Sequence, residues 1–81
     1  MRVRVLFFAS FRDAAGRAEE TRDLPVGSRL VDLWAALSRE LPHFAKFAAA
    51  PPAAINREYV LLETPLAEGD EVAFLPPVAG G

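Results

Sequence analysis

The opening residues of the chain alternate between apolar and polar positions. In residues 2–9 every second side chain is apolar at first, and the apolar set is Val3, Val5 and Phe7. A period of two predicts a β-strand with one buried face. Towards the end of this stretch the opposite face also becomes apolar, at Leu6 and Phe8, so it offers a second apolar surface.

A helical period replaces this alternation in the middle of the chain. Apolar residues recur three or four positions apart as one stripe, formed by Leu30, Leu33, Trp34, Leu37 and Leu41. Ser28 stands where a helix N-cap is expected. Pro42 should end the helix, because the residue before a proline is pushed out of the α region. The pattern therefore predicts a helix that begins after Ser28 and ends before Pro42.

Shorter stretches predict four more strands joined by turns and one longer connection. The predicted strands are residues 18–24, 53–56, 59–62 and 70–76. The first of these is polar on both faces, which is typical of an edge strand. Turns are predicted at residues 13–17, 57–58 and 65–69. Residues 43–52 form an Ala/Pro-rich connection that Phe44 and Phe47 are placed to pin to the core.

The end of the chain divides into a strand and a short tail. The side chains of residues 70–76 alternate between two faces, with Val72 and Phe74 on one and Ala73 and Leu75 on the other. Residues 77–81 carry no pattern that would hold them in a fold. We therefore expect one domain over residues 1–76 and a flexible tail over residues 77–81.

The order of the predicted elements is strand, strand, helix, strand, strand, strand. This order resembles the β-grasp, or ubiquitin-like, fold, an α+β arrangement with a mixed sheet of about five strands. One main helix packs on one face of that sheet. The resemblance also implies that the last strand lies parallel beside the first, which periodicity cannot show.

Composition narrows the classes of function. The 81 residues carry a net charge of -2, which argues against nucleic-acid binding, since that needs clustered Lys and Arg. The absence of cysteine excludes disulfides, thiol nucleophiles and Cys-rich metal sites. No apolar run approaches the ~20 residues that span a bilayer, and no signal-peptide pattern is present. We expect a cytoplasmic protein that binds no membrane.

The Gly80-Gly81 ending is the strongest candidate for chemistry. Two glycines form a tail without Cβ atoms, which can enter a channel that side chains would block. A terminal carboxylate has a pKa of about 3.3–3.7, so it is ionised and can attack the α-phosphate of ATP. Adenylation then makes its carbonyl open to attack by sulfur. Frayed glycine tails are common, but a position directly behind a strand of a β-grasp pattern favours the functional interpretation.

Three groups of residues make a family resemblance specific: residues 5–9 with Arg12, residues 54–56, and residues 69–74 running into residues 76–78 and Gly80-Gly81. Through them, and over nearly its whole length, the sequence resembles the small subunit of molybdopterin synthase, a ubiquitin-like sulfur carrier. The resemblance implies that a ubiquitin-activating-type adenylyltransferase consumes ATP to adenylate Gly81, which is then converted to a thiocarboxylate. The large synthase subunit uses this sulfur to build molybdopterin from cyclic pyranopterin monophosphate.

The same resemblance implies the assembly and the division of labour. The chain would be a non-catalytic sulfur donor in a heterotetramer of two small and two large subunits. Neither GxGxxG nor a Walker sequence is present, so nucleotide chemistry must belong to the partner, and we expect no bound cofactor. His43 is the single histidine and has no second ligand near it in the pattern. We expect it to be a surface residue at a helix end, and we expect no metal site.

Partner-binding residues follow partly from strand parity. Phe8 and Leu75 point away from the helix-covered face, and if their strands are neighbours they form one exposed apolar patch at the base of the tail. A second small core under a loop is the alternative. The resemblance adds Tyr59, although a smaller aliphatic residue is common there. It also adds Arg12, which matches the family motif but is nearly as well explained as a plain surface arginine, together with Pro76, Pro77 and Val78.

An acidic stretch is a weaker candidate for partner binding. Residues 58–71 contain no basic residue, and their acidic members are Glu58, Glu63, Glu68, Asp70 and Glu71. They would complement a basic partner surface. A solvated acidic face is the commoner explanation.

Other functions stay open at this point. The nearest rival function is a sulfur carrier for tRNA thiolation or thiamine synthesis. The others are a ubiquitin-like modifier joined to lysines and a binding module with an inert tail. A thiamine carrier would not be expected to have the run from Phe74 to Val78 before the glycines. A tRNA-thiolation carrier is harder to exclude, because the activating enzyme can be shared.

Overall fold

Five strands and three helices make up the part of the chain that the computed structural model describes, residues 1–46 and 50–75. The strands are β1 (Arg2–Phe7), β2 (Glu19–Asp23), β3 (Ala53–Ile55), β4 (Glu58–Val60) and β5 (Glu71–Phe74). The helices are α1 (Ala9–Ala15), α2 (Leu30–Glu40) and α3 (Pro42–Ala45).

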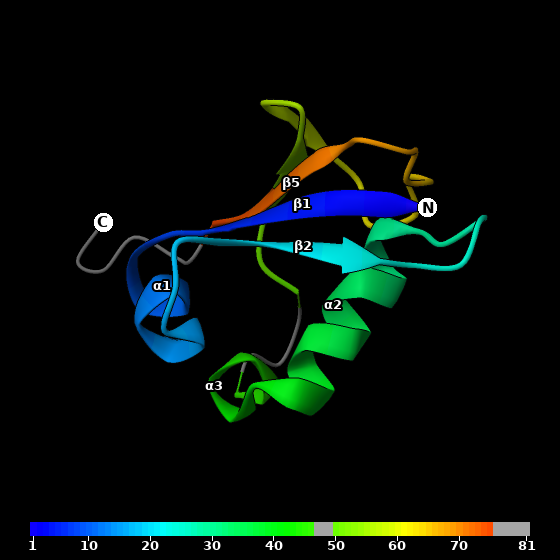
Figure 1. Ribbon diagram of the computed structural model, residues 1–81. Coiled ribbons are helices and arrows are strands. Elements are labelled where there is room, and N and C mark those ends of the chain that lie inside the picture. Colours follow the sequence, from blue (N-terminus) through cyan, green and yellow to red (C-terminus); the bar gives the residue numbers. More distant parts are fainter. Residues whose placement is uncertain (47–49, 76–81) are drawn as a thin grey trace.

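The strands form one mixed sheet in the order β2-β1-β5-β3-β4. β1 pairs antiparallel with β2 and parallel with β5, while β3 pairs antiparallel with both β5 and β4. Figure 1 shows β1 lying between β2 and β5, so the first and last strands lie side by side in the middle of the sheet. The parallel pairing of the first and last strands, the edge position of the second and the mixed five-stranded sheet are confirmed.

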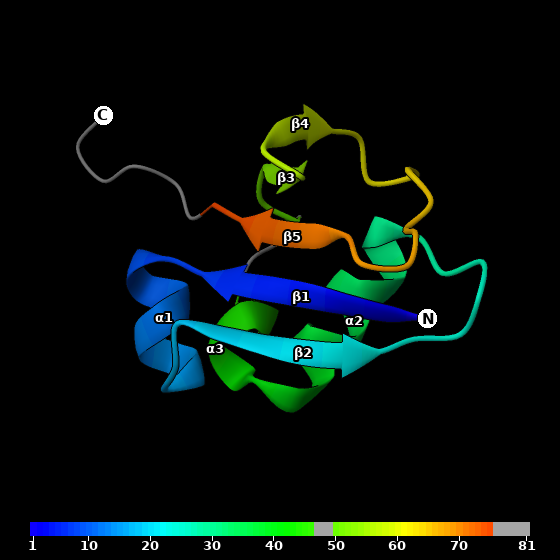
Figure 2. The same cartoon turned by 45° about the horizontal axis from the view of Figure 1, so that its top comes forward.

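All three helices lie on the same side of this sheet, behind it in the view of Figure 2. The core forms between them and the inward face, where Val3, Val5 and Phe7 of β1 are buried as predicted. On α2 the predicted stripe is buried from Leu30 to Leu37, and only Leu41 is partly exposed. Trp34 packs its ring against Phe74 of β5 with centroids 5.1 Å apart. Burial of this stripe holds α2 across the sheet and leaves the other face open.

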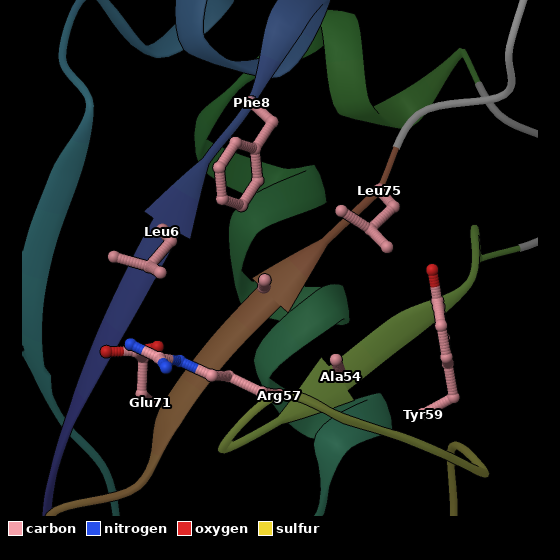
Figure 3. A pocket seen from close by; sticks show the side chains of 8 residues that line it. Leu6, Phe8, Ala54, Arg57, Tyr59, Glu71 and Leu75 are labelled. Carbon is pink, nitrogen blue, oxygen red and sulfur yellow. The ribbon is translucent and has the colours of Figure 1, made fainter.

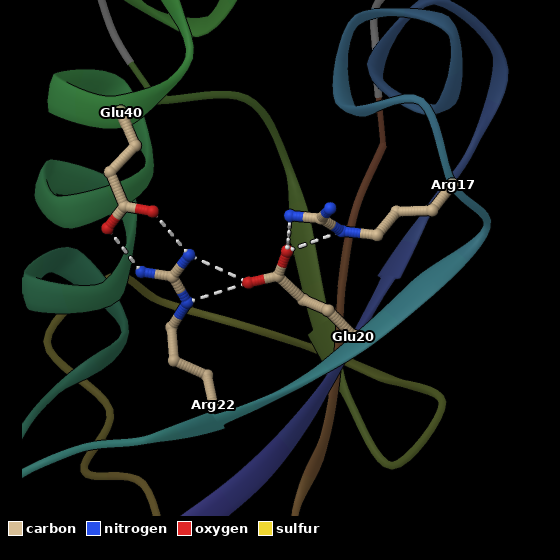
Figure 4. Close-up of polar contacts among 4 residues, drawn as sticks. All are labelled: Arg17, Glu20, Arg22 and Glu40. Carbon is tan, nitrogen blue, oxygen red and sulfur yellow. Dashed lines mark hydrogen bonds and ion pairs between the residues drawn. The ribbon is translucent and has the colours of Figure 1, made fainter.

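The edge strand β2 is held by charges where an apolar side chain would be expected. Glu20 and Arg22 are paired with Val5 and Val3, so they point to the helix-covered face. Arg22 donates hydrogen bonds of 2.7 and 2.8 Å to Glu40 of α2 and one of 2.9 Å to Glu20, which also accepts from Arg17 (Figure 4). The hydrogen bonds to Glu40 are the main cause that raises the pKa of Arg22. This network closes the side of the core.

The turn predicted at residues 13–17 is wrong, because α1 occupies most of that stretch. Phe11 of this helix is fully buried and packs 4.6 Å from the ring of Phe44 and 6.0 Å from Trp34. A single buried residue in two turns gives no helical period, so the sequence pattern could not reveal it. The helix ends at Gly16, whose φ of 76° suits a glycine C-cap.

Ser28 does not cap α2, contrary to the prediction. It is buried, and its hydroxyl donates a hydrogen bond of 2.7 Å to the carbonyl of Pro25 in the preceding turn. The N-cap is Arg29, whose backbone N–H donates to the carboxylate of Asp32 at 2.8 Å. An acidic residue at this third helical position satisfies the helix terminus and complements its dipole.

The connections after α2 differ from the prediction in two places. α2 ends at Glu40 as expected, but Pro42 then begins α3, where Phe44 is fully buried. Phe47 lies outside the described residues. The turn between β3 and β4 falls at residues 56–57, one position earlier than predicted, and both residues have positive φ, at 52° and 72°. Such a two-residue turn matches the twist of a hairpin.

Candidate functional site

The open face of the sheet is polar at one end and apolar at the other. Its polar half is covered by ion pairs that link neighbouring strands. Arg2 Nε lies 3.1 Å from an oxygen of Asp23, and Arg4 pairs with both Glu19 at 3.4 Å and Glu71. These pairs neutralise the half of the face where β1 begins. The apolar half lies where β1 and β5 end, the same end from which residues 76–81 continue.

An apolar hollow of about 450 Å³ occupies that second half (Figure 3). Its lining residues come from β1, β3, β5 and the β3–β4 hairpin, and they are Leu6, Phe8, Ala54, Arg57, Tyr59, Glu71, Ala73 and Leu75. We refer to this set as the apolar hollow. Six of the eight are alanine, leucine, phenylalanine or tyrosine, so its surface is mainly apolar.

Strand register explains the shape of the apolar hollow. Leu6 is paired with Ala73, Ala73 with Ala54, and Ala54 with Tyr59, so these four side chains form one row across four strands. Two alanines in the middle of the row leave depth between bulkier neighbours. Because paired residues share a face, each of these side chains is fixed by the backbone ladder. The result is a shallow site whose floor is set by the strand register.

The structure brings together the apolar residues that parity singled out. Phe8 is 45% exposed and Leu75 is half-buried, and Figure 3 shows them at the same end of the apolar hollow. The prediction of one exposed apolar patch is therefore confirmed. Tyr59 belongs to β4, is 73% exposed and lies on the opposite side of the apolar hollow from Phe8. Pro76, Pro77, Val78, Gly80 and Gly81 lie outside the described residues, and their predicted roles stay predictions.

Arg12 lies beside the apolar hollow and not in it. It is exposed on α1 and lines a smaller hollow of about 240 Å³, which shares Leu6 and Phe8 with the larger one. Phe8 thus stands between the two hollows. Within residues 1–46 and 50–75, Arg12 forms no ion pair, so its side chain is available to a partner.

Much of the acidic stretch at residues 58–71 has a structural role. Glu71 pairs with Arg4, and Glu68 accepts a hydrogen bond of 3.0 Å from the backbone N–H of Arg2. Asp70 accepts hydrogen bonds of 3.0 Å from Asn56 and 2.8 Å from the backbone of Ala67. These carboxylates hold the β3–β4 turn and the loop before β5 in place.

The described residues contain neither a cluster of metal ligands nor a membrane-spanning helix. Among them, no group of three or more His, Cys, Asp or Glu side chains is placed to hold a metal ion. His43 is half-buried with its ring edge-on to Phe11, at a centroid distance of 6.1 Å, so it is less exposed than expected. No helix in residues 1–46 and 50–75 is long and apolar enough to cross a bilayer.

Sequence reasoning missed three residues of the apolar hollow. Ala54 and Arg57 could have been found only with the hairpin register, which depends on where the turn falls. Ala73 was assigned to the correct face, but a small side chain gave no sign that it forms the floor of a site. For Ala54 and Arg57 the missing information was the position of the turn, and for Ala73 it was which strands are its neighbours.

Comparison with known proteins places the chain in a family. A model of the ThiS family matches residues 5–81. The chain belongs to the ThiS family. Two of the relatives that match this chain over nearly its whole length are named molybdopterin synthase sulfur carrier subunit. That of Escherichia coli (strain K12) is 40% identical over 98% of this chain and 99% of its own. That of Chlamydomonas reinhardtii is 37% identical over 100% of both chains.

Solved structures agree with this ThiS-family assignment. A putative molybdopterin converting factor subunit 1 from Pyrococcus furiosus matches with a TM-score of 0.87 and 32% identity, over 96% of this chain and 99% of that one. A complex of subunits 1 and 2 of molybdopterin-converting factor from Helicobacter pylori matches with a TM-score of 0.71 and 29% identity, over 100% of both chains. SAMP1 from Haloferax volcanii matches with a TM-score of 0.85 and 25% identity, also over 100% of both.

Proposed function

We propose that this chain is the sulfur carrier subunit of a molybdopterin synthase and that its working group is the terminal carboxyl of Gly81. The observation that carries the proposal is the apolar hollow on the open face, which ends at Leu75, two residues before the tail of residues 77–81. A partner that covers the apolar hollow receives the tail at the same time. Relatives that match over the full length bear the name of this function.

The proposed chemistry needs little from the carrier itself. An oxygen of the Gly81 carboxylate attacks the α-phosphate of ATP in the active site of an adenylyltransferase, and pyrophosphate leaves. A sulfur nucleophile at the oxidation level of hydrosulfide then attacks the carbonyl carbon, and AMP leaves with that oxygen. The product is a thiocarboxylate, whose sulfur passes to the pterin precursor in the large subunit, and water supplies the oxygen that restores the Gly81 carboxylate. The carrier supplies a terminus without Cβ atoms and a surface that positions it.

The apolar hollow accounts for docking in this proposal. Phe8 and Tyr59 lie exposed around it and Leu75 is half-buried beside them, so binding needs no rearrangement of the sheet. The Helicobacter pylori complex contains subunit 1 together with subunit 2, which supports a large-subunit partner for this chain. We further propose that the activating enzyme uses the same surface, so that the two partners bind in turn, in the cytoplasm. The heterotetramer is part of the same proposal.

Intact-mass spectrometry of the protein purified from its own cells tests the carrier role. We expect a fraction of molecules to gain the mass of one sulfur-for-oxygen exchange, and fragmentation should place it on Gly81. A variant that lacks Gly81, or carries one added residue after it, should not gain this mass and should not support molybdopterin formation. Normal molybdopterin formation by either variant would refute the proposal.

One observation favours a second function. The similarity to SAMP1 covers all of both chains, and the small archaeal modifier protein 1 (SAMP1) from Methanosarcina acetivorans is 28% identical over 99% of this chain and 96% of its own. If this chain also modifies proteins, its C-terminus should be joined to lysines of other proteins through isopeptide bonds. Mass spectrometry of tryptic peptides from cell extracts would detect such adducts, and their absence would leave sulfur transfer as the sole role.

A further inference from the structure

One positively charged side chain lines the apolar hollow and forms no ion pair with a described carboxylate. Arg57 is exposed, belongs to the β3–β4 turn and lines the apolar hollow, and Figure 3 shows its side chain reaching across β5 towards Glu71. No hydrogen bond or ion pair joins it to another residue within 1–46 and 50–75. By contrast, Arg2, Arg4 and Arg22 on the sheet are each paired with carboxylates.

The carboxylates near Arg57 either interact with other residues or point to the other face of the sheet. Glu71 lines the apolar hollow but pairs with Arg4. Asp70 accepts hydrogen bonds from Asn56 and from the backbone of Ala67. Glu58 precedes Tyr59 on β4, so by alternation it points to the opposite face. Arg57 is therefore the charged residue of the apolar hollow that forms no ion pair within the described residues.

The turn does not require an arginine at this position. The φ of 72° lies in the left-handed region, where glycine, asparagine or aspartate is less strained than arginine. A partner that fills the apolar hollow would also cover the guanidinium and remove water from it. Removing water from an unpaired cation is costly unless an opposite charge meets it. The backbone conformation and the cost of desolvation together indicate that the Arg57 side chain acts in partner binding and not in stabilising the fold.

We propose that Arg57 pairs with an Asp or Glu side chain of the large synthase subunit, in a segment whose apolar side chains fill the apolar hollow. This inference rests on the proposed function. The apolar contacts give most of the affinity, while the charge pair selects a partner with a correctly placed carboxylate and speeds its approach. Arg57 is thus a specificity-determining residue of the docking surface.

Isothermal titration calorimetry of the full-length chain with the recombinant large subunit of the same organism tests this pairing. We expect Arg57→Gln to weaken binding about tenfold at low salt and Arg57→Lys to retain most of the affinity, because charge is the main requirement. The loss should shrink as salt rises, since salt screens the pair. Arg29→Gln is the matched control: Arg29 is exposed at the start of α2, on the helix side, and should bind as the wild type does.

Two outcomes separate this inference from the proposed function. If the wild-type chain binds the large subunit and Leu75→Glu abolishes binding, but Arg57→Gln binds with unchanged affinity and salt dependence, the pairing is refuted and the carrier function stands. If the wild-type chain does not bind the large subunit, both fail. Melting temperatures of the Arg57 variants should equal that of the wild type, because Arg57 makes no hydrogen bond or ion pair within the described fold.

Discussion

Phe8 is the residue whose removal should separate docking from folding most clearly. Its side chain forms the ridge between the apolar hollow and the smaller one beside Arg12. Its backbone carbonyl accepts hydrogen bonds of 3.0 Å from Phe11 and 3.3 Å from Arg12, which begin α1. These bonds do not depend on the side chain, so Phe8→Ala should keep α1 and lose only the ring.

The size of the effect on binding follows from the exposed area. A phenylalanine buries about 150–250 Å² when enclosed, so its 45% exposure leaves about 70–110 Å² for a partner to cover. At about 25 cal/mol per Å² this area is worth about 2–3 kcal/mol. Association does not realise all of this energy, so we expect the lower end, a Kd raised ~30-fold.

The effect on stability should be smaller, because the ring is only partly buried. We expect Phe8→Ala to lower the free energy of unfolding by about 1 kcal/mol and Tm by about 4–8 °C. At 25 °C the variant should remain folded, which circular dichroism would verify. Binding can then be compared with the wild type without correction for unfolded protein.

Calorimetric titration with the large subunit measures the change in Kd. Val26→Ala is a matched control, because Val26 is 89% exposed in the loop before α2 and is not part of either hollow. Its Kd should stay within about twofold of the wild-type value. An unchanged Kd for Phe8→Ala, or an equal loss for Val26→Ala, would contradict docking at the apolar hollow.

Two further predictions concern stability. Glu40→Gln replaces the charge-assisted hydrogen bonds to Arg22 and should lower the free energy of unfolding in urea by about 0.5–1 kcal/mol at pH 7. Those hydrogen bonds are the main cause that lowers the pKa of Glu40 in the folded protein. The stability that Glu40 contributes is therefore present above its pKa in the unfolded chain and is lost as pH falls through its pKa in the folded protein. The difference between the two proteins should vanish in acid, and a constant difference would argue against the ion pair. Asn56→Ala removes the acceptor of the Glu71 N–H and the donor to Asp70, and should cost about 1–3 kcal/mol. Asn56→Gly should cost less than Asn56→Ala, because φ is 52° there, and equal losses would show that strain is unimportant.

The sequence by itself determined those elements whose pattern is local. The period of two in β1 and the period between three and four in α2 each record one buried face, so they can be read without knowing what covers that face. Pro42 ends α2 because a proline keeps the residue before it out of the α region, which is a local effect. The Gly80-Gly81 ending, and the outward parity of Phe8 and Leu75, were likewise visible in the printed residues.

Tertiary structure alone decided which segments are neighbours. α1 is stabilised by Phe11 in the aromatic core, so it could not follow from a local pattern. The parallel pairing of β1 with β5 joins residues far apart in the sequence, and hydrophobic periodicity carries no information about such partners. The floor at Ala54 and Ala73 and the unpaired charge of Arg57 exist only once that pairing and the hairpin register are set. The docking surface is therefore a property of strand order, and the sequence specifies it through contacts that no single segment contains.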